Sequence, residues 1–179
     1  MKKDRFEAFT DGVLAIILTI LVLDIHLNSN NHSLKVLINV LPEFAAYIVS
    51  FIIIAVMWVN HHYLFLRVKR INHKMIYINI LLLFWATILP ATTAWFGSDI
   101  ESELAALLYA TNVLFYNLAF LILIYEVQRS NDYLQRKLKY GLISVLFNVL
   151  TVLIVFIWPP FILISLLLDV TLWAIQPVI

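Results

Sequence analysis

Residues 5–24, RFEAFTDGVLAIILTILVLD, decide the fold of this chain. The second half of the stretch is an almost unbroken apolar run. The first half places four polar residues, Arg5, Glu7, Thr10 and Asp11, near the start of the same helix. An ionisable group at the centre of a membrane span costs roughly 2.5–3.5 kcal/mol on insertion scales, so such groups usually face protein or water and mark a pathway. The stretch therefore predicts a membrane helix that takes part in handling ions.

The composition extends this interpretation to the whole chain. Apolar residues make up 63% of the 179 residues and charged residues only 13%, whereas a soluble globular domain carries about 25% charge. A span needs about 20 mostly apolar residues, and six segments satisfy this requirement: 6–26, 40–64, 74–96, 102–126, 140–158 and 160–177. We therefore expect an all-α, polytopic membrane protein with one six-span domain over residues 1–179. The absence of cysteine excludes disulfides and thiolate metal sites.

The basic residues predict how the spans are oriented. All but one of the 12 lysines and arginines flank the first span or lie in the loops after the second and fourth spans, and the exception is Lys35. These residues are Lys2, Lys3, Arg5, Arg67, Lys69, Arg70, Lys74, Arg129, Arg136, Lys137 and Lys139. Loops rich in Lys and Arg stay in the cytoplasm. Both termini are therefore expected to be cytoplasmic, with the acidic loop 97–103 on the opposite side.

The first span has one continuous apolar stripe. At 100° per residue, Ile16, Ile20 and Leu23 share a face of the helix, with Thr19 at its edge. Asp11 lies about 140° from Ile16, so it points toward neighbouring spans if the stripe faces a symmetry axis. The alternative is that the stripe faces lipid or a packed core, which is the commoner case for an apolar stripe in a membrane helix.

The second span ends in residues 57–63, MWVNHHY. Because the first two spans run antiparallel, these residues lie level with the polar start of the first helix. We expect Asp11 to accept a hydrogen bond from Trp58 or from one of the adjacent histidines, and Arg5 to be capped by Asn60 or a carbonyl. Such a cluster is compatible with a structural clamp and with a pH sensor.

A metal site at the adjacent histidines His61 and His62 is disfavoured. Neighbouring residues on a helix point about 100° apart, helical metal pairs prefer spacings of three or four with a carboxylate nearby, and the nearest acid is Glu43.

The other polar groups within the spans are Asn112, Asn117, Asn148 and Asp169. The three asparagines are expected to bond neighbouring helices at about 0.6 kcal/mol each. Asp169 has no obvious partner and is assigned to a subunit contact or the cytoplasmic rim.

The motif Arg5-xxx-Phe9-Thr10-Asp11 resembles the Arg-xxx-Phe-Ser-Asp signature that opens the first helix of the transmembrane protein 175 family, with Thr10 in place of the usual serine. The end of the second span, Trp58-x-Asn60-His61-His62, is also similar to the bacterial members, and the resemblance covers essentially the whole chain. Because threonine keeps a hydroxyl, the replacement puts little in doubt.

This resemblance implies a potassium-permeable cation channel in a bacterial plasma membrane, a homotetramer of six-span subunits without a cofactor or nucleic-acid partner. It places the pore along the first helix. The implied constriction falls at Ile16, with Ile20 and Leu23 farther out and Thr19 adding a hydroxyl ring, and Asp24 lies at the outer vestibule. It also places Arg5, Phe9, Thr10 and Asp11 against the second span, in a network with Trp58, Asn60, His61 and His62.

Two alternatives remain at this point. The first is a proton-coupled secondary transporter that uses Asp11, Asp169 and the histidines as a relay; the scarcity of glycine and the lack of paired broken spans count against it. The second is a small membrane enzyme or metal protein built on His61, His62 and His73. No catalytic motif is visible, so a non-enzymatic protein is expected.

Overall fold

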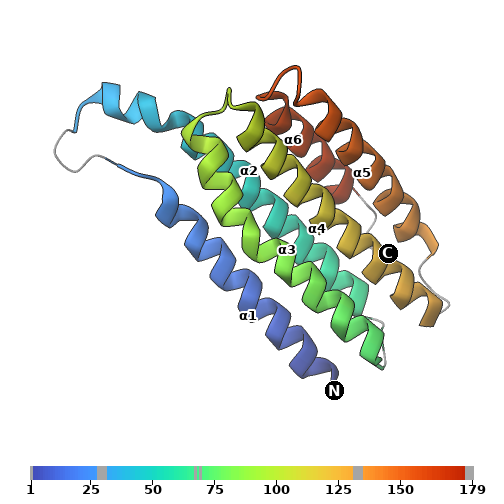
Figure 1. Cartoon of the computed structure of the whole chain (residues 1–179). Helices are drawn as coiled ribbons and strands as arrows, with labels where there is room; N and C mark the ends of the chain where they lie inside the picture. Colours follow the sequence, from blue (N-terminus) through green and yellow to red (C-terminus); the bar gives the residue numbers. More distant parts are fainter. Residues whose placement is uncertain (1, 28–31, 67, 69, 131–134, 176–179) are drawn as a thin grey trace.

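The computed structural model describes residues 2–27, 32–66, 68, 70–130 and 135–175. These residues are almost wholly helical, as the sequence predicts. Six α-helices and one 3-10 turn follow one another: α1 (Lys3–Leu21), η1 (Val22–Asp24), α2 (Leu34–Phe65), α3 (His73–Ser98), α4 (Glu103–Ser130), α5 (Gln135–Ile154) and α6 (Phe161–Ala174). Figure 1 shows an up-and-down bundle with α1 at one edge, α3 and α4 in the middle, and α5 and α6 at the opposite edge.

Four of the described helices are long and apolar enough to cross a membrane, namely α1 with η1, α2, α3 and α4. The helix α6 has only 14 residues, or about 21 Å at 1.5 Å per residue, against a hydrocarbon core of about 30 Å. The apolar part of α5 is also short. Six helices are therefore present, and the crossing of the membrane by the last two remains a prediction.

Several helix boundaries differ from the sequence expectation, and two of the differences involve proline. The helix α2 begins at Leu34 rather than near residue 40, because the helix continues through Pro42. The helix α5 ends at Ile154, and residues up to Pro160 form the turn that the Pro159-Pro160 pair predicts.

Close backbone approach and buried hydroxyl groups hold α2 against α3 and α4. Gly97 allows the close approach, since a Cβ atom at this position would lie 3.0 Å from the Cα of Glu43. Deeper in the bundle, the Ser50 hydroxyl lies 2.6 Å from that of Thr93 and 2.5 Å from that of Tyr109. All three side chains of this hydroxyl cluster are buried, so three helices share one hydrogen-bonded group.

A second polar group joins α4, α5 and α6. The Oδ2 atom of Asp169 accepts hydrogen bonds from the amides of Asn117 and Asn148, each at 3.1 Å, and the indole of Trp173 donates to Ser144 at 3.0 Å. Asp169 is only 5% exposed, so its assignment to a subunit contact or the cytoplasmic rim is wrong. Partners that are 52 and 21 residues away in the chain are invisible to a local sequence pattern. Asn112 also bonds across helices, with its amide 3.2 Å from the Thr92 hydroxyl.

The Asp169 contacts generate a stability prediction. Asp169→Leu removes the acceptor, leaving the buried Asn117 amide unsatisfied and the Asn148 amide with only the carbonyl of Ser144, at a cost of about 1–3 kcal/mol. Asp169→Asn keeps an acceptor oxygen. We expect the thermal unfolding midpoint of the purified protein in detergent to fall clearly for the leucine variant and less for the asparagine variant. Equal midpoints for the two variants would show that the hydrogen bonds contribute nothing measurable.

Candidate ion pathway along the first helix

The helix α1 has one face buried in the bundle. Its buried residues recur every three or four positions and pack against α2 and α3; they are Phe6, Thr10, Leu14, Ile17 and Leu21. This spacing is that of a helix lying on a packed core. The rotation of α1 is therefore defined, and much of its remaining surface, including Phe9, Ile16 and Ile20, is exposed in the single chain.

The uncovered surface carries the apolar stripe. Ile16 is 59% exposed and Leu23 is 73% exposed, and Ile20 and Phe9 are exposed on the same side. Thr19 is also exposed, and its hydroxyl donates to the carbonyl of Ile16 at 2.7 Å. Because that proton is already engaged, the Thr19 oxygen offers its lone pairs to the space outside the helix.

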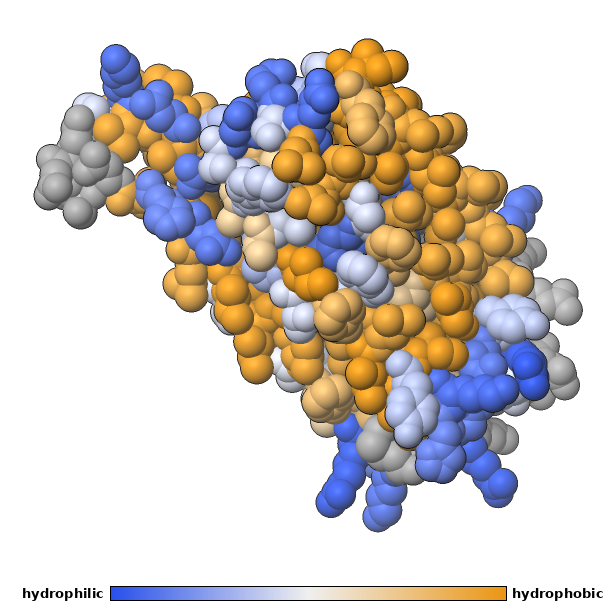
Figure 2. All heavy atoms as spheres, in the orientation of Figure 1, coloured by the Kyte–Doolittle hydropathy of each residue, from blue (hydrophilic) through white to orange (hydrophobic). Residues whose placement is uncertain are grey.

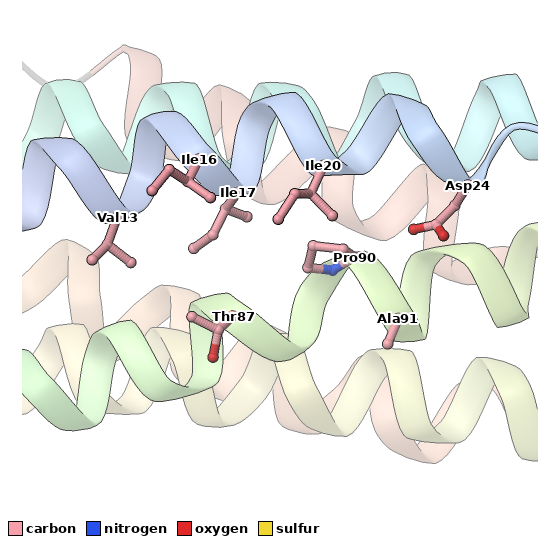
Figure 3. Close-up of a pocket in the computed structure, with 8 residues that line it drawn as sticks. All are labelled: Val13, Ile16, Ile17, Ile20, Asp24, Thr87, Pro90 and Ala91. Atoms are coloured by element: carbon pink, nitrogen blue, oxygen red, sulfur yellow. The ribbon is translucent and has the colours of Figure 1, made fainter.

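A groove of about 410 Å³ lies between α1 and α3 beside this stripe. Its residues are Val13, Ile16, Ile17, Ile20 and Asp24 from the first helix and its extension, and Thr87, Pro90 and Ala91 from α3. Figure 3 shows Ile17 and Ile20 pointing from α1 toward α3, with the Asp24 carboxylate at one end of the row. The groove therefore combines apolar walls with a single carboxylate at one end.

A chain of hydrogen bonds connects the start of α1 to α2 and α3. The His61 ring nitrogen Nε2 lies 3.0 Å from the Asn79 carbonyl oxygen, and the Asn79 amide donates to the Thr10 hydroxyl at 2.8 Å. Thr10 in turn donates to the carbonyl of Phe6 at 3.2 Å. With the amide nitrogen of Asn79 used as a donor, its oxygen accepts, so His61 carries a proton on Nε2. All three polar side chains are buried.

Asp11 forms a separate pair with the second helix. The Trp58 indole donates to the Asp11 carboxylate at 2.8 Å, which is the first of the two partners that the sequence suggested. Both side chains are exposed on the surface of the single chain. Asp11 lies within a helix that is apolar enough to cross a membrane, and an exposed carboxylate there is incompatible with lipid. This side of α1 therefore faces water or protein.

Other members of the expected network lie elsewhere. The Asn60 amide donates to the carbonyls of Val56 and Trp173, so Asn60 does not cap Arg5. No hydrogen bond or ion pair holds Arg5 within the described residues. Arg5 and Phe9 instead line a second groove between α1 and α3, because Phe9 precedes Ile16 by seven residues and lies on nearly the same side of the helix.

The two histidines have different surroundings. His61 is buried against Phe6, with ring centroids 6.0 Å apart, whereas His62 is exposed and stacks on Trp58. Among the described residues, no three His, Asp or Glu side chains are close enough to hold a metal ion. The hypothetical site of His61, His62 and His73 is therefore not assembled.

The sequence interpretation missed Asn79, the residue that connects His61 to Thr10. The available signal was one asparagine within the apolar stretch 76–83 of the third span. A polar amide in such a run normally has a partner on another helix. Only the packing of α3 on α1 shows which partner it has.

Comparison with known proteins identifies the family of this chain. The family described as "Endosomal/lysosomal potassium channel TMEM175" matches residues 5–90. A potassium channel of Chryseobacterium sp. (strain P1-3) is 36% identical over 165 residues, which cover 89% of this chain and 85% of that protein. The endosomal/lysosomal proton channel TMEM175 of Gallus gallus is 33% identical over 130 residues, or 65% of this chain and 26% of that longer protein.

The fold agrees with the sequence matches. The crystal structure of a lysosomal potassium-selective channel TMEM175 homolog from Chamaesiphon minutus superimposes with a TM-score of 0.68 and 29% identity, covering 93% of this chain and 97% of that chain. Fold and site therefore define a membrane ion channel rather than an enzyme, which confirms the non-enzymatic expectation. The chain belongs to the TMEM175 family, and the resemblance of its signature motif is confirmed.

The buried chain of hydrogen bonds predicts which polar residue matters most for stability. Asn79→Leu leaves the buried His61 ring without its hydrogen bond and Thr10 with only the carbonyl of Phe6, so we expect the free energy of unfolding to fall by about 1–3 kcal/mol. Thr87→Val is the matched control on the same helix, because the exposed Thr87 hydroxyl bonds only to the carbonyl of Phe84. Thermal unfolding in detergent measures both variants. An Asn79→Leu protein as stable as Thr87→Val would contradict the interpretation.

Proposed function

We propose that this chain forms a homotetrameric, potassium-permeable cation channel in a bacterial plasma membrane, with a central pore lined by α1. Each chain contributes one six-span channel unit. The basic residues at the ends of the helices, such as Lys3, Arg70 and Arg129, are placed in the cytoplasm together with both termini. The channel needs no cofactor, and the permeant cation is its only small-molecule ligand.

The observation that carries the proposal is the uncovered side of α1. This side exposes the large apolar stripe, including Phe9, Ile16 and Ile20, along a membrane-spanning helix at the edge of the bundle. The exposed Asp11 carboxylate lies about 140° from Ile16 around the same helix, on the side of α2, and an acid within a span usually faces protein or water. A central path lined by copies of α1 accounts for both features, because the apolar side chains meet their symmetry mates and Asp11 lies among the packed helices of adjacent copies rather than in lipid.

The exposed small residues of α1 support contact between copies. Ala8, Gly12, Ala15 and Thr19 are all exposed and recur every three or four positions beside the apolar stripe. Small residues allow membrane helices to approach closely. In a closed ring, one side of each subunit meets a different side of its neighbour, and the groove between α1 and α3 offers such a second side.

Four copies of Ile16 around an axis form a narrow constriction without oxygen ligands. An ion crossing it loses part of its water shell, and potassium holds its water less tightly than the smaller sodium ion. Potassium is therefore favoured, and the discrimination is modest because nothing replaces the lost water. Such a hydrophobic constriction gates by dewetting, since a small widening rehydrates it. Thr19, with its lone pairs turned outward, supplies the nearest oxygen ring for a partly dehydrated ion.

Asp24 is proposed to concentrate cations at the outer mouth. It follows Leu23 directly and lies at one end of the groove beside α3. A carboxylate in a cleft with low-dielectric walls raises the local cation concentration. The acids Asp99, Glu101 and Glu103 of the loop between α3 and α4 add to this field at the same side.

The constriction is tested with Ile16→Asn. An amide replaces the apolar ring and supplies carbonyl oxygen ligands to any cation, so we expect conductance to rise and the potassium-to-sodium permeability ratio to move toward one. The measurement is the reversal potential in planar bilayers under bi-ionic conditions. Ile122→Asn, on an exposed face of α4, is the control and is expected to leave the ratio unchanged.

Two results would overturn the proposal in different ways. An unchanged permeability ratio in Ile16→Asn would remove Ile16 from the constriction. Saturating flux without unitary current steps would indicate the carrier rather than the channel.

The role of Asp24 is tested with Asp24→Asn. The attraction of cations by a fixed charge is screened over about 30 Å at 0.01 M salt and about 3 Å at 1 M salt. We therefore expect single-channel conductance to fall by about twofold or more at low salt and to remain near wild type at high salt. A loss of equal size at both salt concentrations would point to a structural effect instead.

A further inference from the structure

The first turns of α2 are not needed for crossing the membrane. The helix has 32 residues, whereas about 20 span the hydrocarbon core, so roughly a dozen residues are in excess. The excess lies at the N-terminal end, since the C-terminal end at Phe65 is level with the start of α1, where Lys3 donates to the carbonyl of Leu66. Figure 1 shows these first turns directed away from the rest of α2 and extending beyond the end of α1, on the side opposite to α4–α6.

The direction of this segment is set at Pro42. Proline has no N–H, so the carbonyl of Ile38 has no helical partner and the helix bends. Two contacts of the next residue, Glu43, hold the corner in place: its backbone packs against Gly97 of α3, and its carboxylate accepts a hydrogen bond from the backbone of His26 at 3.1 Å. Residues 34–41 therefore project from a fixed point.

The projecting segment is amphipathic, and its apolar face has no cover. Leu34, Leu37, Ile38 and Leu41 fall within about 100° of one another on the helix. All four are exposed, Leu34 by as much as 72%. Lys35 lies on the other side together with the exposed Asn39. Four adjacent aliphatic side chains without a partner mark a contact surface, which we call the α2 arm (residues 34–41).

We propose that the α2 arm packs against the outer end of a second copy of this chain and so completes the outer mouth of the channel. This inference rests on the proposed tetramer. The arm extends past α1 (Figure 1), and apolar atoms lie on this projecting part of the molecular surface (Figure 2). The segment that follows α1 exposes two more leucines, Leu23 and Leu27. Since the uncovered side of α1 meets neighbouring copies in the proposed assembly, an element extending beyond α1 on that side reaches a neighbour rather than the lipid around α4–α6.

Charge complementarity supports the same partner. Lys35 has no hydrogen bond or ion pair within the described residues. The acids at this end of the chain include Asp24 of η1, Asp99 and Glu101 in the loop between α3 and α4, and Glu103 at the start of α4. A neighbouring copy presents this acidic end to the single cation of the arm. The proposed contact therefore combines the burial of four aliphatic side chains with the attraction between Lys35 and the acids of the neighbouring copy.

The absence of cysteine from the chain makes the inference directly testable. Leu37→Cys and Leu41→Cys on the apolar face, and Asn39→Cys on the polar face as the control, are each labelled with a benzophenone maleimide in proteoliposomes and irradiated. Benzophenone inserts into any nearby C–H bond, so the product identifies the neighbour. We expect covalent dimers on denaturing gels for the first two variants and at least severalfold fewer for Asn39→Cys.

Every outcome has a defined meaning. Dimers that form from the apolar face and decrease on Lys35→Glu support the contact between copies. Adducts of the apolar-face variants with phospholipid alone, or within the same chain alone, overturn it. Native mass spectrometry of the same samples separates the two levels of the argument: a tetramer whose arms label only lipid overturns the arm contact and leaves the channel in place, whereas a monomer overturns both.

Discussion

The rotation of α1 about its own axis is the constraint on which the rest of the site depends. In a bilayer, lipid tails are as apolar as leucine, so burial of apolar surface does not decide which apolar face of a helix packs against the bundle. Hydrogen bonds make the distinction here. The Asn79 amide holds Thr10 on the inner side, and the Trp58 indole holds Asp11 on the side of α2. With both contacts satisfied, Ile16 is directed away from the bundle.

Buried hydrogen bonds between helices recur elsewhere in the protein. The Ser50 hydroxyl joins α2 to α3 and α4, and Asp169 joins α6 to α4 and α5. Each cluster lies among apolar helices, where an unsatisfied polar group is costly and partners are scarce. The two clusters hold the five helices behind α1 together as a support. The apolar stripe of α1 and the α2 arm stay exposed on the single chain, and both are proposed to contact other copies.

Much of the architecture could be predicted because it depends on local composition and spacing. Long apolar runs mark helices wherever they occur, and the Pro159-Pro160 pair marks a turn through the covalent chemistry of proline. The common face of Ile16, Ile20 and Leu23 follows from helix geometry alone, and so does the pairing of Asp11 with the end of α2. The errors concern partners that are distant in sequence. The local pattern places Asp169 at a subunit contact or the cytoplasmic rim, offers Asn60 or a carbonyl as the cap of Arg5, and gives no role to Asn79. An isolated polar residue in an apolar helix indicates that a hydrogen-bond partner is needed, but the sequence does not show which helix provides that partner.

The amino-acid sequence by itself determined the membrane class, the number of helices, the signature at the start of the first helix and the stripe of large apolar residues, because each of these is a property of neighbouring positions along one helix. Only the tertiary structure decided which side of that helix is uncovered, which histidine is buried, and that the start of α2 extends past α1. Those outcomes depend on which helices lie side by side. That arrangement follows from matching buried donors with acceptors across helices, which no single stretch of the chain contains.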